Sequence, residues 1–161
     1  QFDRLDSLGI EYKVCPGVSS FCGMASSLKA EYTLPDVSQT VIITRMAGRT
    51  PVPESEQISK LAVHGSTMII FLSTGMLKEL SAELIKGGYS PETPSAIVYK
   101  ATWSDEKILR CKVSELAETA KANNITKTAL VAVGNFLGDD YSLSKLYDKN
   151  FETEFRKCGL Q

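Results

Sequence analysis

Two arginines that flank a glycine mark the part of this sequence best suited to bind an anion. They lie in residues 39–54 (QTVIITRMAGRTPVPE), where a β-branched run opens directly into a loop. Gly48 lets the backbone turn and the prolines after it stiffen the chain, so Arg45 and Arg49 can present two guanidinium forks to carboxylates in a shared crevice. Thr50 stands beside them as a further candidate. The alternative is a solvated turn with surface arginines.

Other candidate binding residues follow expected strands. In open α/β sheets, ligands bind at the carboxyl ends of the strands. Ser19 and Ser20 lie between an expected strand and a helix, although helix capping alone would also explain them. The corresponding segments after two later strands are Leu72-Ser73-Thr74-Gly75 and Lys100-Ala101-Thr102-Trp103, for which helix capping and packing of the tryptophan are the alternatives.

Nucleophilic and metal chemistry have little support in the sequence. His64 is the single histidine and precedes Gly65 at an expected helix end, where capping explains it better than catalysis. The four cysteines form no Cys-x-x-Cys pair and no dense framework, which predicts reduced thiols and no metal site. No Ser/His/Asp set or phosphate-binding glycine–lysine loop is present. An enzyme with this sequence would act mainly by positioning its reactants, and no catalytic residue is assigned.

Composition limits the kinds of partner. The chain has 161 residues, 43% of them hydrophobic, and a formal net charge of -1, which is typical of a globular protein with one sizeable core. This charge provides no basic field for nucleic acid or for a membrane surface. The longest apolar runs are too short to span a bilayer. These features predict a soluble, cytoplasmic protein that binds a small, non-polymeric ligand.

Short β-rich runs alternate with helical patterns, which predicts an α/β fold with a mostly parallel or mixed sheet and covering helices. Residues 68–72 and 129–133 are apolar without alternation, as expected of central strands covered on both faces. Residues 106–113 alternate more and suggest an extra, more exposed strand, with an antiparallel arrangement as one option. The expected strands are 11–14, 41–44, 67–72, 96–100 and 129–133, and the expected helices are 19–28, 54–63, 76–86 and 114–123.

The amino-terminal part of this pattern differs from the rest. Residues 1–10 resemble the last turns of an amphipathic helix that stops at Gly9. A chain that begins inside a helix is expected to be a piece of something longer; a trimmed end with nothing important missing is the alternative. Residues 31–38, with Pro35 between a helix and a strand, form the best candidate for an interdomain linker.

Several segments together resemble the precorrin-4 C11-methyltransferase family of tetrapyrrole methylases. The most specific are TRxxGRTPxPE within residues 39–54 and YKATWxDE within residues 98–106. The resemblance covers essentially the whole chain, whereas relatives that methylate uroporphyrinogen or diphthine precursors lack this combination. The supporting segments are residues 16–21 and 64–68 and, near the carboxyl terminus, residues 133–135, 144–148 and 151–156.

This resemblance implies a three-layer αβα C-terminal methylase domain at 36–161, preceded at 1–35 by the last helix, strand and helix of an N-terminal domain. It implies S-adenosylmethionine as methyl donor, S-adenosylhomocysteine as product, and a homodimer. The implied reaction is methylation at C11 of cobalt-precorrin-4 or, as the second choice, of metal-free precorrin-4 in cobalamin biosynthesis. Methylation of another tetrapyrrole carbon and a non-catalytic dimerisation or ligand-binding module are the alternatives. The implied cofactor-binding residues are Ser19, Ser20, Leu72, Ser73, Ala101, Thr102, Val133 and Gly134, and Arg45, Arg49 and Thr50 would hold the tetrapyrrole carboxylates.

The sequence departs from the family in two glycine-rich segments. The family carries Gly-x-Gly-Pro-Gly-Asp and Gly-Asp-Pro segments, which form part of the cofactor cleft and the tetrapyrrole trough, and this sequence contains neither. The chain is therefore expected to be inactive alone. Residues 11–14 and the helix after Ser19 are expected to be rearranged, swapped or stabilised by another copy.

Overall fold

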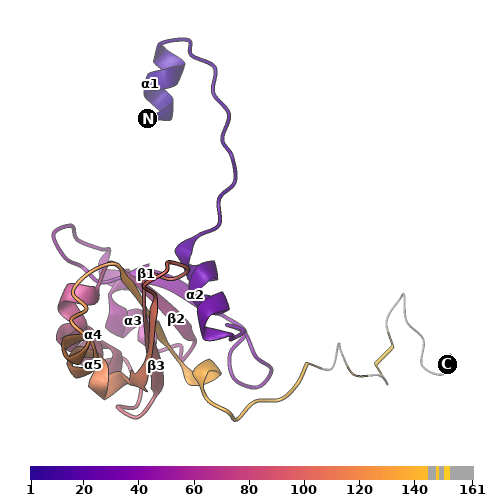
Figure 1. Ribbon diagram of the computed structural model, residues 1–161, viewed down its shortest axis with the longest axis vertical. Helices are drawn as coiled ribbons and strands as arrows, with labels where there is room; N and C mark the ends of the chain where they lie inside the picture. Colours follow the sequence, from indigo (N-terminus) through magenta and orange to yellow (C-terminus); the bar gives the residue numbers. More distant parts are fainter. Residues whose placement is uncertain (145–147, 149–150, 153–161) are drawn as a thin grey trace.

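A mixed sheet of five strands, in the order β1-β2-β5-β3-β4, forms the centre of the molecule (Figure 1). The computed structural model describes residues 1–144, 148, 151 and 152. The predicted α/β fold is confirmed, and of the two kinds of sheet expected, mostly parallel or mixed, the sheet is mixed. The strands are β1 (Val41–Arg45), β2 (Thr67–Phe71), β3 (Pro94–Tyr99), β4 (Lys107–Lys112) and β5 (Ala129–Val133).

The strand directions decide which loops meet. β1 and β2 are parallel, β5 is antiparallel to both β2 and β3, and β4 is antiparallel to β3. It follows that β1, β2 and β3 end at one edge of the sheet, which we call the exit edge. β5 starts at this edge, where Ala129 pairs with Tyr99, and ends at the opposite edge, where Val133 pairs with Met68 and Ser95.

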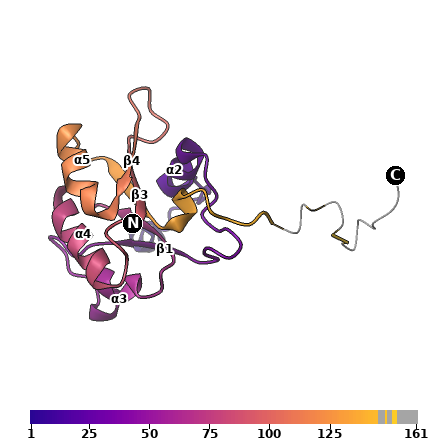
Figure 2. The ribbon, with the colours of Figure 1, turned by 90° about the horizontal axis from the view of Figure 1, so that it is seen from below.

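Helices cover both faces of the sheet and complete three layers (Figures 1 and 2). On one face, Leu80 and Leu84 of α4 pack in a buried cluster with Ile70 of β2. On the other face, Met24 of α2 packs in a second cluster with Val98 of β3. The apolar runs predicted to be central strands are β2 and β5, and both are flanked by strands on either side. The covering helices are α3 (Ile58–Ala62), α4 (Leu77–Lys86) and α5 (Leu116–Ala122) on the first face and α2 (Ser20–Leu28) on the second.

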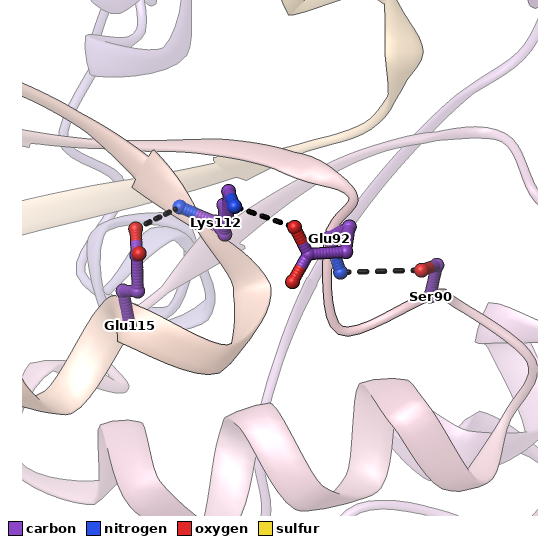
Figure 3. A network of polar contacts seen from close by, with 4 residues as sticks. All are labelled: Ser90, Glu92, Lys112 and Glu115. Carbon is purple, nitrogen blue, oxygen red and sulfur yellow. Dashed lines mark hydrogen bonds and ion pairs between the residues drawn. The ribbon is translucent and has the colours of Figure 1, made fainter.

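β4 is the exposed, antiparallel edge strand that the alternating sequence suggested. A polar network fixes its end at the opposite edge of the sheet (Figure 3). The Lys112 ammonium lies 2.5 Å from Glu92 Oε2, and the Lys112 amide donates to Glu115 Oε2 at 2.9 Å. The Glu92 amide in turn donates to Ser90 Oγ at 3.2 Å. These contacts join the end of β4 to the start of α5 and to the loop before β3.

The first 19 residues lie apart from the body of the molecule (Figure 1). α1 (Phe2–Ser7) ends two residues before Gly9, the predicted stop, whose φ of +63° turns the chain out of the helix. The strand predicted at residues 11–14 is wrong for this structure, because no strand of the described chain lies beside this segment to accept its hydrogen bonds. The linker predicted at 31–38 packs instead against the α2 face of the sheet through Tyr32 and Leu34.

Two predicted helices begin with separate 3₁₀ turns. The helix expected at 54–63 is divided at Gln57, whose ψ of 144° is extended, into a turn at Glu54–Glu56 and α3. The helix expected at 114–123 starts with a turn at Val113–Glu115 and continues as α5. The helix expected at 19–28 matches α2, with Ser19 as the residue before its first turn.

Candidate functional site

A cavity of about 370 Å³ opens at the exit edge, between the ends of β2 and β3 and the start of β5. Ser20 of α2, Leu72 after β2 and Ala101 after β3 all line it. These three residues belong to separate segments that were predicted to bind a ligand, and the fold brings them together. A cavity of this size falls within the range of small-molecule sites.

The cavity wall suits a ligand with one apolar and one polar part. Leu72, Val98 and Leu130 provide apolar surface, and Ser20 and Thr74 provide hydroxyl groups. Asp and Glu are absent from the described residues that line it, whereas two lysines take part. The remaining lining residues are Phe71, Gly75, Lys100, Ala101, Trp103, Thr126, Lys127, Thr128 and Ala129.

The backbone adopts an uncommon conformation at both strand ends that border the cavity. Leu72, Lys100 and Thr102 have φ angles of 53°, 48° and 71°, the left-handed region that side chains other than glycine rarely adopt. Such residues persist only where their surroundings hold them, and they concentrate at ligand sites. Here the Lys100 amide donates to the Thr128 carbonyl at 2.9 Å, which joins the end of β3 to the start of β5.

Lys100 organises the loop between β3 and β4. Its ammonium lies 2.5 Å from Asp105 Oδ2, 5.1 Å from the ring centroid of Tyr99 and 5.3 Å from that of Trp103. The hydrogen bond between Lys100 and Asp105 raises the pKa of the ammonium and lowers the pKa of the carboxyl group. Trp103 stays 62% exposed, so its indole ring is held by a cation–π contact at the rim of the cavity and remains accessible to a ligand.

Ser73 is buried behind the cavity and does not line it. Its hydroxyl accepts a hydrogen bond from the Met46 amide at 3.1 Å and donates to the Phe71 carbonyl at 2.8 Å. Ser73 therefore joins the loop after β1 to the loop after β2. It supports the exit edge, which a sequence pattern alone could not distinguish from contact with a ligand.

Thr102 and Ser19 border the site without lining the cavity. The Thr102 amide donates to Glu106 Oε2 at 2.6 Å. Ser19 precedes α2, but its side chain makes no capping hydrogen bond. Both residues are adjacent in sequence to lining residues, Ala101 and Ser20 respectively.

Val133 and Gly134 lie at the opposite edge of the sheet from the cavity. Both are buried, and the Gly134 amide donates to the Pro94 carbonyl at 3.0 Å. β5 runs antiparallel to its neighbours, so its carboxyl end lies at the other edge of the sheet from the carboxyl ends of β2 and β3. The geometry therefore separates these two residues from the other candidates.

Arg45 and Arg49 lie at the exit edge but play different parts. Arg45 donates from Nη1 to the carbonyls of Met46 and Thr50, at 3.1 and 3.2 Å, and from Nη2 to that of Pro51 at 2.9 Å. Its guanidinium group thus stabilises its own loop. Arg49 and Thr50 are exposed in that loop, so Arg49 is the better placed of the two arginines to meet an anion.

Neither the segment before β5 nor a role for Glu106 was predicted from the sequence. Thr126, Lys127 and Thr128 line the cavity because the antiparallel β5 starts at the exit edge. No sequence signal gives this strand direction. Glu106 belongs to the YKATWxDE segment, so its motif was visible although its contacts were not.

The remaining expectations concern membrane-spanning helices, the cysteines and the carboxyl-terminal segment. No helix among the described residues has the length and apolar character needed to cross a membrane. Cys15, Cys22 and Cys111 are free thiols, and Cys158 lies outside the described residues. Most of the segment resembling the family's carboxyl terminus at 144–156 also lies outside them.

Comparison with known proteins defines the class of this protein. The profile of the family described as Tetrapyrrole (Corrin/Porphyrin) Methylases matches residues 1–117, and the chain belongs to this family. The predicted membership of the tetrapyrrole methylases is confirmed.

Among individual relatives, the chain is similar to the cobalt-precorrin-4 C(11)-methyltransferase of Methanocaldococcus jannaschii. The two are 54% identical over 158 residues, which cover 98% of this chain and 61% of that protein. The precorrin-4 C(11)-methyltransferase of Mycobacterium tuberculosis (strain H37Rv) is 38% identical over 149 residues, 91% of this chain and 59% of that protein. The chain thus spans about three fifths of the length of these relatives.

Solved structures support the same fold. The X-ray structure of a cobalt precorrin-4 methyltransferase, a cobalamin biosynthetic enzyme, matches with a TM-score of 0.83 and 43% identity, covering 86% of this chain and 58% of that chain. A uroporphyrin-III C-methyl transferase from Thermus thermophilus, complexed with S-adenosyl homocysteine, matches with a TM-score of 0.64 at 20% identity, over 83% of this chain and 54% of that chain. At that identity the second match supports the fold alone.

Proposed function

We propose that this chain is part of an S-adenosylmethionine-dependent methyltransferase that acts on C11 of cobalt-precorrin-4 in cobalamin biosynthesis, with metal-free precorrin-4 as the second candidate substrate. The observation that carries the proposal is the cavity where Ser20, Leu72 and Ala101 meet at the exit edge. The similarity to the cobalt-precorrin-4 C(11)-methyltransferase of Methanocaldococcus jannaschii favours the cobalt-containing substrate.

The cavity wall fits the chemistry of S-adenosylmethionine. Apolar surface at Leu72 and Leu130 suits the faces of an adenine ring, and the hydroxyl groups of Ser20 and Thr74 can bond to polar atoms of the ligand. The exposed Trp103 ring suits a sulfonium cation. Lysines in the wall complement a carboxylate, and no carboxylate among the described lining residues opposes it. When bound, S-adenosylmethionine supplies an electrophilic methyl group.

Methyl transfer forms a bond between the methyl carbon and the substrate carbon and breaks the S–CH₃ bond, whose electron pair stays on sulfur. The task of this chain is to orient the two reactants and exclude water, which supplies much of the rate in such reactions. The residues that line the cavity fix the donor, and the loop between β1 and α3 faces the same edge. No proton-transfer residue is assigned.

In the same proposal, Arg49 and Thr50 hold carboxylates of the tetrapyrrole, and Arg45 orients their loop through its three hydrogen bonds. An arginine fork binds a carboxylate in a bidentate manner that lysine does not reproduce. We also propose from the family resemblance that the protein is a cytoplasmic homodimer, and that residues 1–35 correspond to the end of the family's N-terminal domain, although α2 packs here on the sheet of residues 36–161. Ser19, Ser73 and Thr102 take supporting positions around the cavity.

Titration of the chain with S-adenosylhomocysteine, monitored by calorimetry and by the fluorescence of Trp103, tests the cofactor site. Trp103 is the single tryptophan of the chain, so its signal reports on the rim of the cavity. We expect a Kd weaker than micromolar, because the glycine-rich segments of the family are absent. Ala101→Leu fills the cavity and should abolish this binding, whereas Ala122→Leu, at the exposed end of α5, should not change it. Binding that survives Ala101→Leu, or no binding by the wild-type chain at millimolar ligand, would contradict this assignment.

A panel of tetrapyrroles tests the substrate class. Cobalt-precorrin-4, metal-free precorrin-4 and uroporphyrinogen III are each added to the chain, and binding is measured with the wild type and with Arg49→Lys. We expect the precorrin-4 forms to bind more tightly than uroporphyrinogen III and Arg49→Lys to weaken both. Equal affinity for all three compounds would count against the C11 assignment.

A further inference from the structure

We propose that Glu106 is a positioning residue for the cavity: its carboxylate holds α2 and the β3–β4 loop together, so that Ser20 and Ala101 keep their places in one wall. The role of the cavity in cofactor binding rests on the function proposed above, whereas the positioning itself can be tested without a ligand.

One carboxylate oxygen of Glu106 joins two distant segments. Glu106 Oε2 accepts hydrogen bonds from Ser27 Oγ at 2.6 Å and from the Thr102 amide at 2.6 Å. Ser27 lies on α2, the helix whose first residue is Ser20, and Thr102 directly follows Ala101. The two donors therefore belong to the two segments that bring Ser20 and Ala101 to the cavity.

The β3–β4 loop depends on such support. Lys100 and Thr102 both have positive φ, and neither is glycine, so this backbone conformation needs contacts that hold it. Lys100 has its own contacts with Asp105 and two aromatic rings. The Thr102 amide is held by its hydrogen bond to Glu106.

α2 rests directly on this loop beside the Glu106 contact. A Cβ atom added at Gly23 would lie 3.3 Å from Thr102 Cγ2 and 3.8 Å from the Cβ of Ala101. Gly23 thus allows close approach, and the hydrogen bond between Ser27 and Glu106, one helical turn further on, fixes it. The hydrogen bonds from Ser27 and Thr102 lower the pKa of Glu106, as expected of bonds made to its ionised form.

The structure offers a matched comparison at the opposite edge of the sheet. Glu115 Oε2 accepts the Lys112 amide at 2.9 Å (Figure 3), which is the same kind of contact, a glutamate bonded to a backbone amide. Neither Glu115 nor Lys112 lines the cavity. Glu115→Gln therefore controls for the general effect of neutralising such a glutamate.

The experiment compares the full chain carrying Glu106→Gln, Glu106→Ala, Ser27→Ala or Glu115→Gln with the wild type. Two measurements need no ligand: hydrogen exchange of the Thr102 amide by NMR, and quenching of Trp103 fluorescence by acrylamide. We expect Glu106→Ala to accelerate Thr102 exchange by about tenfold or more, because a hydrogen bond to a charged acceptor is lost. Trp103 should become more accessible to acrylamide. Glu106→Gln should show a smaller change in the same direction, and Glu115→Gln should show neither.

Affinity for S-adenosylhomocysteine is measured in parallel with thermal unfolding. A general loss of stability would lower the apparent affinity only at temperatures where a variant is partly unfolded. We expect instead that Glu106→Ala weakens binding about tenfold at a temperature where it is fully folded, that Ser27→Ala weakens it less, and that Glu115→Gln leaves it unchanged.

Wild-type Thr102 exchange and wild-type Trp103 quenching in Glu106→Ala would overturn the positioning role. Failure of the wild-type chain to bind S-adenosylhomocysteine would be a different result, because it contradicts the proposed cofactor site while the two ligand-free measurements still decide the role of Glu106.

Discussion

Replacing Ser73 with alanine should destabilise the protein, because Ser73 acts as a structural link at the exit edge. The Ser73 side chain is only 1% exposed, and its hydroxyl bonds to the Met46 amide at 3.1 Å and to the Phe71 carbonyl at 2.8 Å. Ser73→Ala removes both bonds and leaves the Met46 amide without its acceptor. The cost should be about 1–2 kcal/mol, since a buried polar group that loses its partner costs about 1–3 kcal/mol and the alanine recovers part of this by removing the hydroxyl.

The assay is thermal and urea unfolding, monitored by far-ultraviolet circular dichroism. For a domain of this size, 1 kcal/mol shifts Tm by about 2–4 °C, so a fall of about 2–8 °C is expected. Hydrogen exchange at the Met46 amide should accelerate in the same variant. Ser90→Ala is the matched control: its exposed hydroxyl accepts one amide bond, from Glu92 at 3.2 Å, and its loss should cost no more than about 0.5 kcal/mol.

The result that would refute this reasoning is a Ser73→Ala variant as stable as the wild type with a reduced affinity for S-adenosylhomocysteine. Such a variant would mean that Ser73 contacts the ligand, as the sequence resemblance implied, and that its hydrogen bonds to the β1 loop contribute little. Loss of stability with wild-type exchange at Met46 would also contradict the link described here.

Three other predictions concern single positions. Gly87→Ala should cost about 1–3 kcal/mol in thermal unfolding. The new Cβ would lie 2.4 Å from the Cβ of Ala62 and 2.6 Å from the Ser59 carbonyl oxygen, both in α3. Gly75→Ala is the control and should be neutral, because its new Cβ meets nothing within 4 Å. Burial raises the pKa of Tyr89 from 10.0 to about 12, so as the pH rises the Tyr89 hydroxyl ionises first in the unfolded state. The free energy of unfolding, measured in urea, should therefore fall as the pH rises from 10.0 to about 12. Tyr89→Phe should make this fall shallower. Arg45→Met should increase cleavage by proteases within the loop that Arg45 holds, whereas Arg49→Ala should leave cleavage at the wild-type rate.

Much of the fold could be predicted because local patterns and tertiary packing agree. The apolar runs at β2 and β5 lack alternation, and the structure covers both strands on both faces. In α4 the leucines at 77, 80 and 84 recur at helical spacing and are all buried. Gly9 ends α1 in the left-handed conformation that glycine adopts without strain. Each of these features depends on residues close together in sequence.

The features that the sequence could not predict depend on how the chain folds in three dimensions. Residues 11–14 have the composition of a strand, but a strand also needs a neighbour, and the described chain provides none beside them. Arg45 has the side chain of an anion-binding residue, yet its guanidinium group bonds to three carbonyls of the following loop. No pattern in the sequence indicates that these carbonyls turn toward it. The site residues that do meet, Ser20, Leu72 and Ala101, were found because each follows or precedes a well-defined element.

The antiparallel direction of β5 explains both why Val133 and Gly134 lie away from the cavity and what forms the third side of the cavity. In an all-parallel sheet, the residues after β5 would lie between the ends of β2 and β3, and Val133 and Gly134 would occupy that position. Because β5 runs the other way, its starting segment with Thr126, Lys127 and Thr128 takes their place in the cavity wall. The cavity thus lies at the carboxyl ends of β2 and β3, where ligands of α/β sheets usually bind. The third side of the cavity is instead formed by the amino end of a strand, and this depends on the path of the whole chain.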